Sequence, residues 1–353
     1  MATTSEAMGY SGAYRHPRSA LAVDWRAPDR RRTFQLVLAS LWLFDAVLQF
    51  QPYMFTRAFG TQMIGGSAAG NPAALAGQIT WAGRAIGHHA MFSGTVFALV
   101  QLVIALGIAW RPTVKLALAA SVAWALAVWW IGEGLGGILT GTASPVSGAP
   151  GAVVLYGLLA VLLWPPSVGT DDAAPFVAAG TVGPGVARGL WFVLWGSLCY
   201  FSLQGAVRAP QALHDKIRET ALGQPHWLAT LDNGAARLVA HRGLEFSVVL
   251  AILLAIVALG PLAGRAATRS SVVIAIAVAL VIWVVGQDFG NVFSGSGTDA
   301  NTGPLLILLA ATFWPTTVSR PASGPATSVD PAPIEMVRVP AGPAVPAGSV
   351  GGI

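Results

Sequence analysis

One polar spacing occurs twice in the chain: an arginine followed four residues later by a histidine. The two copies are Arg84–His88 and Arg237–His241. Residues four apart share a face of a helix, so each pair would present a guanidinium beside an imidazole, and Glu245 would extend the second face by one turn. Such groups can bind a quinone headgroup or an anion, or ligate a haem or metal through His88 and His241. They can equally anchor a helix end at the lipid interface.

A second set of polar residues lies within or beside apolar runs. Asp45 sits inside one run, and Gln49 shares its face. Charge within hydrocarbon is costly and marks a candidate functional site, here a proton or cation path; the alternative is a hydrogen bond between helices. Glu133 and Asp288 each lie in a glycine-rich stretch. Glycine lets the backbone leave a helix and expose carbonyls beside a carboxylate, although a helix end followed by a turn fits as well.

The composition indicates the elements that must position these residues. Of 353 residues, 54% are hydrophobic and only 10% charged, against roughly 25% charged in ordinary soluble domains. The net charge of +5 is modest and unclustered, which gives no footprint for nucleic acid. We therefore predict an all-α polytopic transmembrane bundle whose solvent is the lipid bilayer. Eight apolar segments are expected, at 33–50, 88–109, 113–131, 148–164, 189–206, 240–260, 270–286 and 302–314, the fourth and eighth being short for a span.

Basic residues in the short loops predict the orientation. Arg30–Arg32, Arg111 with Lys115, and Arg265 with Arg269 would all fall on one side of eight spans. The positive-inside rule makes that side cytoplasmic, so we expect a multi-pass protein of the plasma membrane with both termini inside. The outer loop 207–239 contains an amphipathic pattern over Gln211–Leu222, which predicts a helix lying flat on the outer surface.

The sequence also repeats itself. Residues 72–109 align without gaps with 225–262, and 125–150 align with 279–304, pairing Trp129 with Trp283 and Pro150 with Pro304. Four helices per unit would insert both halves in the same sense, giving two parallel repeats about an axis along the membrane normal. The predicted plan is a cytoplasmic segment 1–32, a first repeat 33–165, a cytoplasmic linker 166–187, a second repeat 188–315 and a disordered tail 316–353.

This plan resembles the DoxX/DoxD-like family of four-helix membrane proteins, in a duplicated form. The likeness rests on Leu41–Asp45 ending the first segment, on the outer segment, and on a helical pair around a basic turn, such as Glu245 through Gly260 to Arg265. The first half has Phe92 where the second has Glu245. The resemblance implies an association with redox chemistry, with a quinone, haem or metal near the outer surface and a respiratory or redox partner protein.

Three functions remain open from the sequence. The first is the redox role, carried by the Arg/His pairs and Glu245. The second is a small-solute or ion transporter with a path between the repeats lined by Asp45, Glu133 and Asp288. The third is an assembly subunit without chemistry of its own. No phosphate-binding loop, zinc spacing, nucleophile elbow or dinucleotide fingerprint occurs, so ATP-driven or hydrolytic activity has no support in the sequence.

Overall fold

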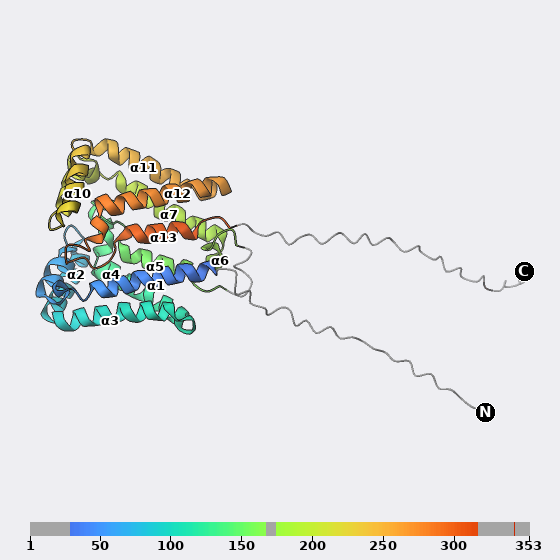
Figure 1. Ribbon diagram of the computed structural model, residues 1–353, viewed down its shortest axis with the longest axis horizontal. Coiled ribbons are helices and arrows are strands. Elements are labelled where there is room, and N and C mark those ends of the chain that lie inside the picture. Colours follow the sequence, from blue (N-terminus) through green and yellow to red (C-terminus); the bar gives the residue numbers. More distant parts are fainter. Residues whose placement is uncertain (1–28, 167–173, 317–341, 343–353) are drawn as a thin grey trace, which may run out of the picture. The chain divides into compact units, whose positions relative to one another are not determined.

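The computed structural model describes residues 29–166, 174–316 and Gly342, and every regular element in these residues is helical. The predicted all-α class is confirmed. Each predicted apolar segment contains a helix, and these helices lie side by side (Figure 1). They are α1 (Arg30–Leu48), α3 (Ala90–Ala109), α4 (Val114–Ile131), α5 (Ala152–Leu162), α7 (Pro184–Ser202), α11 (Gly243–Leu259), α12 (Arg265–Val281) and α13 (Thr302–Thr312).

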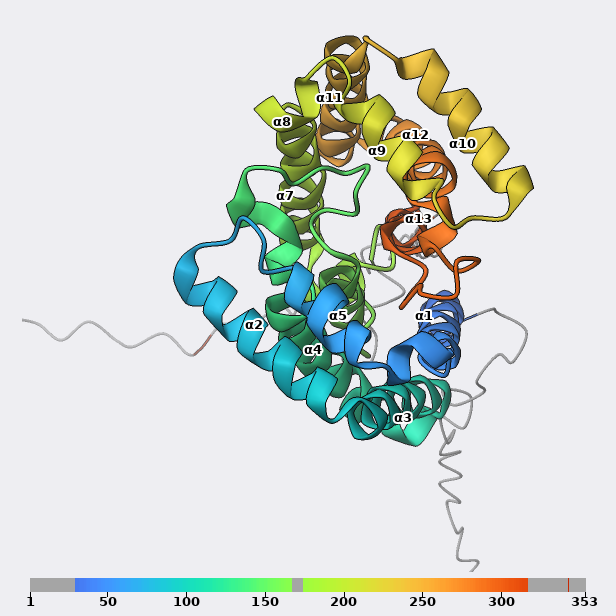
Figure 2. The same ribbon diagram turned by 90° about the vertical axis from the view of Figure 1, so that its left-hand side faces the viewer.

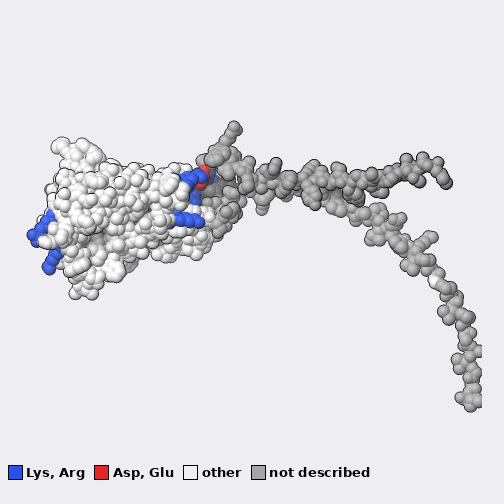
Figure 3. All heavy atoms as spheres, turned by 90° about the horizontal axis from the view of Figure 1, so that it is seen from below, with Lys and Arg blue, Asp and Glu red and all other residues white. Residues whose placement is uncertain are grey.

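Four helical stretches in the described residues are long and apolar enough to cross a membrane. They are Ala90–Ala109, Arg111–Ile131, Gly243–Leu262 and Arg265–Gly286. Their outward side chains are apolar: Leu116, for example, is 74% exposed. On the face seen in Figure 3, Lys and Arg gather at the two ends and the surface between them is uncharged. A continuous apolar surface of this kind suits lipid rather than water.

The helices α5 and α13 are shorter than the sequence predicts. Each has 11 residues, about 16 Å at 1.5 Å per residue, roughly half the thickness of a hydrocarbon core. Both are largely buried, and they contact each other at the centre of the bundle (Figure 2). An irregular segment precedes each, and residues 148–151 of the first are buried. Irregular backbone at membrane depth is tolerated only where protein or a cavity covers it.

Three helices lie across one end of the bundle rather than along it: α2 (Ala73–His88), α9 (Ala212–Thr220) and α10 (His226–Val239) (Figure 2). The helix predicted within Gln211–Leu222 is therefore present as α9. It buries Ile217 against α10 and leaves Asp215, Arg218 and Glu219 exposed. Shorter elements include η1 (Pro52–Phe55), η2 (Phe59–Ile64) and α8 (Gly205–Arg208), with η2 packed on α2.

Arg31 holds the opposite end together. Although it falls in the predicted N-terminal segment, it belongs to the first turn of α1 and is only 5% exposed. Its guanidinium donates to the carbonyl oxygens of Leu162, Trp164 and Val177 at 2.9, 3.1 and 2.6 Å. Two of these carbonyls lie at the C-terminal end of α5, where unpaired carbonyls favour a cation. One buried side chain thus joins α1, α5 and the segment before α7.

Part of the predicted linker 166–187 is packed structure. Phe176 is buried and stacks on Phe313, with ring centroids 4.9 Å apart. The backbone N–H of Ala178 donates to the Thr312 carbonyl, and the short helix α6 (Ala179–Val182) leads into α7. Residues 1–28 of the predicted cytoplasmic segment, and all of the predicted tail except Thr316 and Gly342, lie outside the described residues.

Candidate functional site

Two irregular turns precede α5 and α13, and they have the same backbone form. Leu135 and Gly136 have φ of 58° and 63°, while Phe289 and Gly290 have φ of 56° and 79°. Left-handed backbone of this kind is uncommon outside glycine. A Cβ on Gly136 would lie 2.0 Å from the Pro150 carbonyl oxygen. The turns therefore need glycine both for conformation and for close approach of the backbone.

A side chain from each turn region caps the short helix that follows. The Glu133 carboxylate accepts a hydrogen bond from the Val153 N–H at 3.2 Å, near the start of α5. The Gln287 side-chain oxygen accepts one from the Gly303 N–H at 3.3 Å, near the start of α13. The first residues of a helix have unpaired N–H groups, which such acceptors satisfy. Gln287, rather than Asp288, thus occupies the place in the second half that Glu133 occupies in the first.

Tryptophans stabilise both turns in the same manner. The Trp129 indole donates to the Pro150 carbonyl at 2.7 Å, and the Trp283 indole donates to the Ala300 carbonyl at 2.8 Å. The sequence alignment pairs Pro150 with Pro304. The carbonyl that accepts the hydrogen bond from Trp283 belongs instead to Ala300, four residues earlier, so the alignment is wrong at this position. The second turn is shorter, and an ungapped alignment cannot register this.

An acidic cavity lies beside the first turn. Its volume is about 290 Å³, and no Lys or Arg lines it. Three carboxyl groups do: Asp45 from α1, Glu133 after α4, and Asp299 from the segment before α13. The other lining residues are apolar or neutral: Trp42, Gln49, Phe59, Met63, Ile64, Ile86, Phe97, Gln101, Trp124, Ala127, Val128, Ile131, Gly132, Val153 and Thr298.

Several polar atoms on this cavity have no hydrogen-bond partner. They include four acceptors, Asp45 Oδ1, Gln49 Oε1, Gln101 Oε1 and Glu133 Oε2, and one donor, the indole Nε1 of Trp124. The Tyr156 hydroxyl and the Ala300 N–H lie against the Asp45 carboxyl. A buried acceptor without a donor is costly, on the order of 1–3 kcal/mol. Four such acceptors on one cavity indicate a place for a proton, a cation or a hydrogen-bond donor.

The charge of Glu133 is sensitive to its surroundings. Burial, followed by the negative charge of Asp299, raises the pKa of Glu133 to about 8. Burial also raises the pKa of Asp299, against the opposing hydrogen bonds from Thr298 and Asn301. Carboxyl groups that share a site of low dielectric ionise one after another rather than together. Glu133 therefore holds its proton more tightly than an exposed carboxyl group does.

A second cavity, of about 410 Å³, is lined mainly by α11 and α12, and it is apolar throughout. Phe97, Trp124 and Ile131 of the acidic cavity align with Leu250, Val278 and Val285 of the apolar one. Each cavity also takes part of its wall from the opposite half. Thr298 and Asp299 reach into the first cavity, and Val146 reaches into the second.

The predicted Arg/His constellation is not assembled. His88 ends α2 and is exposed, as is Arg84. The helix α10 ends at Val239, so Arg237 and His241 do not share a helical face, and His241 adopts a φ of 63°. The expectation that the second pair lies on one helix is therefore wrong, because the chain turns from α10 into α11 before reaching the histidine.

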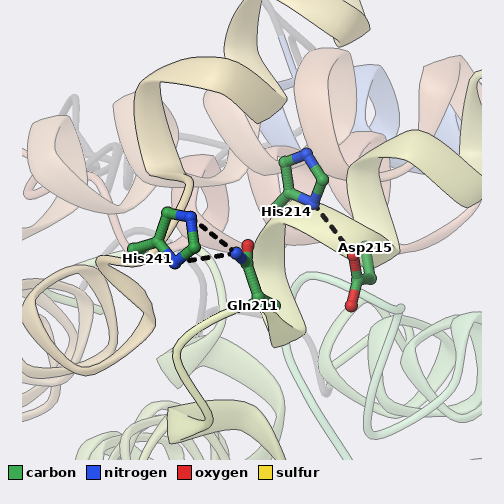
Figure 4. Close-up of polar contacts among 4 residues, drawn as sticks. All are labelled: Gln211, His214, Asp215 and His241. Carbon is green, nitrogen blue, oxygen red and sulfur yellow. Dashed lines mark hydrogen bonds and ion pairs between the residues drawn. The ribbon is translucent and has the colours of Figure 1, made fainter.

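The two histidines also lie apart, since α2 and α10 occupy opposite sides of the bundle end (Figure 2). The Gln211 amide nitrogen contacts the His241 ring nitrogens at 2.8 and 2.9 Å (Figure 4). In the same view His214 contacts Asp215 at 2.9 Å. Glu245 pairs with Arg242 at 3.1 Å on the surface. In the described residues no group of three or more His, Cys, Asp or Glu is placed to hold a metal ion.

Asp288 belongs to a different acidic pair. It faces Asp232 of α10, and both side chains are completely buried. None of their four oxygens accepts a hydrogen bond of ordinary geometry, although the Thr220 hydroxyl lies beside Asp288. Burial first, then the charge of Asp232, raises the pKa of Asp288 to about 7, and burial raises that of Asp232. Two carboxyls in this arrangement share a proton.

We expect this pair to make folding stability depend on pH. The folded pKa of Asp288, about 7, lies above the unfolded value of 3.8. Its contribution is therefore complete below about pH 4 and is lost as the pH rises to about 7. Asp288→Asn cannot ionise, and asparagine tolerates a positive φ. The wild type should lose on the order of 2 kcal/mol more than this variant between pH 5 and pH 8, as measured by thermal melting in detergent. Asp215→Asn, at an exposed position, should keep the wild-type slope, and equal slopes for all three proteins would contradict the prediction.

Sequence reasoning found Asp45, Gln49 and Glu133 but missed Asp299 and Gln101. Asp299 lies in a polar loop, where an acidic residue is ordinary, and it joins the cavity only because the segment before α13 crosses to the other half. Gln101 carried a usable signal, since a glutamine in the middle of the apolar helix α3 needs a partner. Asp232 gave none, because α10 is amphipathic and its polar positions are expected to face water.

No protein-family model, curated protein or solved structure matches the chain. The class of protein therefore has to be described from the fold and the cavity alone. In the described residues it is all-helical, with four helices suited to crossing a lipid bilayer and a cavity lined by three carboxyl groups.

Proposed function

We propose that the chain is an eight-span membrane protein made of two parallel four-helix halves related by a pseudo-two-fold axis. The support is the recurrence of detail. The two turns share their left-handed backbone, Trp129 and Trp283 donate to corresponding carbonyls, and Glu133 and Gln287 cap corresponding helices. Contacts also recur, since α3 packs on α1 as α11 packs on α7.

The same proposal includes an orientation. The turn between α3 and α4 and the turn between α11 and α12 lie at the end where α1 and α7 begin (Figure 1). Both turns are basic, carrying Arg111 and Arg265. By the positive-inside rule this end is cytoplasmic, so both termini lie inside and the acidic cavity opens toward the outer half of the plasma membrane.

The function that the geometry supports best is binding and translocation of a small positively charged solute or ion through the acidic cavity. One observation carries this proposal: Asp45, Glu133 and Asp299 converge on a cavity with no basic residue. Buried carboxylates are stable only when neutralised or paired. An entering cation supplies the positive charge that pairs with these carboxylates. Of the three alternatives the sequence leaves open, this is the transporter.

The redox role that the DoxX-like resemblance implies would need a quinone, haem or metal at the histidines. Both histidines are exposed, and α2 and α10 lie on opposite sides. The cavity also gives a reason for negative charge at Asp45 and at Glu133, since the neutral Gln287 caps its helix without a charge. A respiratory or redox partner protein has no support in the geometry.

Charge movement on a solid-supported membrane tests the proposal. Proteoliposomes would receive concentration jumps of sodium, potassium, ammonium and tetramethylammonium chloride at constant ionic strength. We expect a saturable current for at least one cation, reduced at least tenfold by Asp45→Asn because its carboxylate faces the cavity. Asp215→Asn, an exposed carboxylate, is the matched control and should leave the current unchanged. Absence of a saturable current for every cation, or full current in an Asp45→Asn/Glu133→Gln double variant, would overturn the proposal.

A further inference from the structure

The acidic cavity has an aromatic wall. Phe59, Phe97 and Trp124 form a row of edge-to-face contacts, with centroids 6.3 Å apart for the first pair and 5.5 Å for the second. All three line the cavity, as does Trp42. The faces of aromatic rings carry partial negative charge and attract cations, organic ammonium groups in particular.

The comparison between the two cavities shows which residues distinguish the acidic one. The positions of Phe97 and Trp124 carry Leu250 and Val278 in the apolar cavity. The place of Glu133 is taken by Gln287, which caps its helix without a charge. Packing and capping in this fold therefore require neither these two rings nor this carboxylate. The residues that distinguish the acidic cavity are those that would recognise a cation with apolar substituents.

The size of the cavity leads to the same class of ligand. A volume of about 290 Å³ is roughly ten times the share of one water molecule in the liquid. That space is far larger than a bare metal ion and suits a group of several heavy atoms. The carboxyls are also spread around the walls, and no three of them are close enough to ligate one ion.

We infer that the cavity binds a small alkylammonium ion, with its charge neutralised by Asp45 and Glu133 and its alkyl groups against Phe59, Phe97 and Trp124. This inference rests on the proposed function and names its solute class. Asp45 Oδ1 and Glu133 Oε2, which lack partners, supply the counter-charge. The rings exclude water from the alkyl groups and select against smaller, strongly hydrated cations.

Isothermal titration of the full-length protein in detergent at pH 8.5 tests the inference, with tetramethylammonium chloride and sodium chloride as separate probes at equal ionic strength. We expect saturable binding of tetramethylammonium. Phe97→Leu, which installs the residue of the apolar cavity, should weaken that binding by roughly threefold to thirtyfold. Phe246→Leu makes the same change in the apolar cavity and should have no effect.

The outcomes separate the inference from the proposed function. If sodium binds more tightly than tetramethylammonium, or if Phe97→Leu leaves tetramethylammonium affinity intact, the alkylammonium class is wrong while a cation site stands. If neither salt binds and Asp45→Asn changes nothing, the proposed function fails as well. Should Phe97→Leu unfold, Trp124→Phe and Trp124→Leu replace it. If Trp124→Phe keeps its affinity for tetramethylammonium and Trp124→Leu loses it, the aromatic wall is supported. Equal affinity in the two variants overturns it.

Discussion

Gly136→Ala is expected to prevent accumulation of folded protein. At φ of 63° the new methyl group would lie 2.0 Å from the Pro150 oxygen and 2.4 Å from its carbon. Both atoms belong to backbone that leads directly into α5, so neither can move without displacing that helix. We expect a loss of more than about 4 kcal/mol, which lies in the range of exceptional destabilisation.

A neighbouring glycine provides the matched control. Gly137 has a φ of 70°, yet its nearest contact for a new Cβ is the Thr140 hydroxyl at 3.6 Å. Gly137→Ala therefore incurs only the cost of a left-handed alanine, about 1–2 kcal/mol. Fluorescence-detected size-exclusion chromatography should give a monodisperse peak for Gly137→Ala and none for Gly136→Ala. Similar peaks for both variants would show that close approach at this turn is unimportant.

Arg31→Ala is expected to have the second largest effect. The substitution removes the guanidinium donor from the carbonyls of Leu162, Trp164 and Val177. The Thr181 hydroxyl is then the remaining side-chain donor to the first two, and the Val177 carbonyl loses its charged partner. Hydrogen bonds from a charged donor contribute about 1.5–3 kcal/mol each, and they are not additive. We expect a loss of about 3–5 kcal/mol and a melting temperature lower by on the order of 10 °C. Arg31→Lys should fall between the two, because an ammonium cannot reach as many acceptors as the planar guanidinium.

The adjacent Arg30 serves as control. It has the same side chain one residue earlier but is exposed. Arg30→Ala should melt within about 1 °C of the wild type, since single surface changes are usually within about 0.5 kcal/mol. Thermal denaturation in one detergent at one pH, with all variants compared together, measures both effects. If Arg30→Ala and Arg31→Ala melt alike, the loss is due to basic charge near the terminus and not to the buried contacts.

Much of the fold followed from apolar periodicity. Every predicted apolar segment contains a helix, and α9 lies where its spacing of apolar residues places it. Boundaries were harder wherever tertiary contacts decide them. The helix α1 begins at Arg30 after the N-cap Asp29, which places Arg31 inside the bundle, and Glu133 caps α5 near its start at Val153. A burial of this kind depends on residues more than a hundred positions away in sequence.

The candidate site was only half predictable, for a related reason. The pairs Arg84–His88 and Arg237–His241 were predicted as a site because the same spacing occurs twice. A spacing that recurs can equally reflect a structural requirement at the ends of helices. The acidic cavity is built from what differs between halves, such as Glu133 against Gln287. Asp299 shows the remaining difficulty, because it acts in the half to which it does not belong by sequence.

Each cavity takes part of its wall from the other half of the sequence, so the chain cannot be cut into two fragments that each keep a complete cavity. Cleavage between Trp164 and Phe176 would leave the first fragment without Thr298 and Asp299, and the second without Val146. Neither fragment could close its own cavity, but two fragments together could close both. A single four-helix polypeptide of this design would therefore have to be a dimer to enclose any ligand, and two identical subunits would enclose two identical cavities. When both halves belong to one chain, the two cavities no longer have to be identical. One cavity can then be lined by carboxyl groups while the other is apolar.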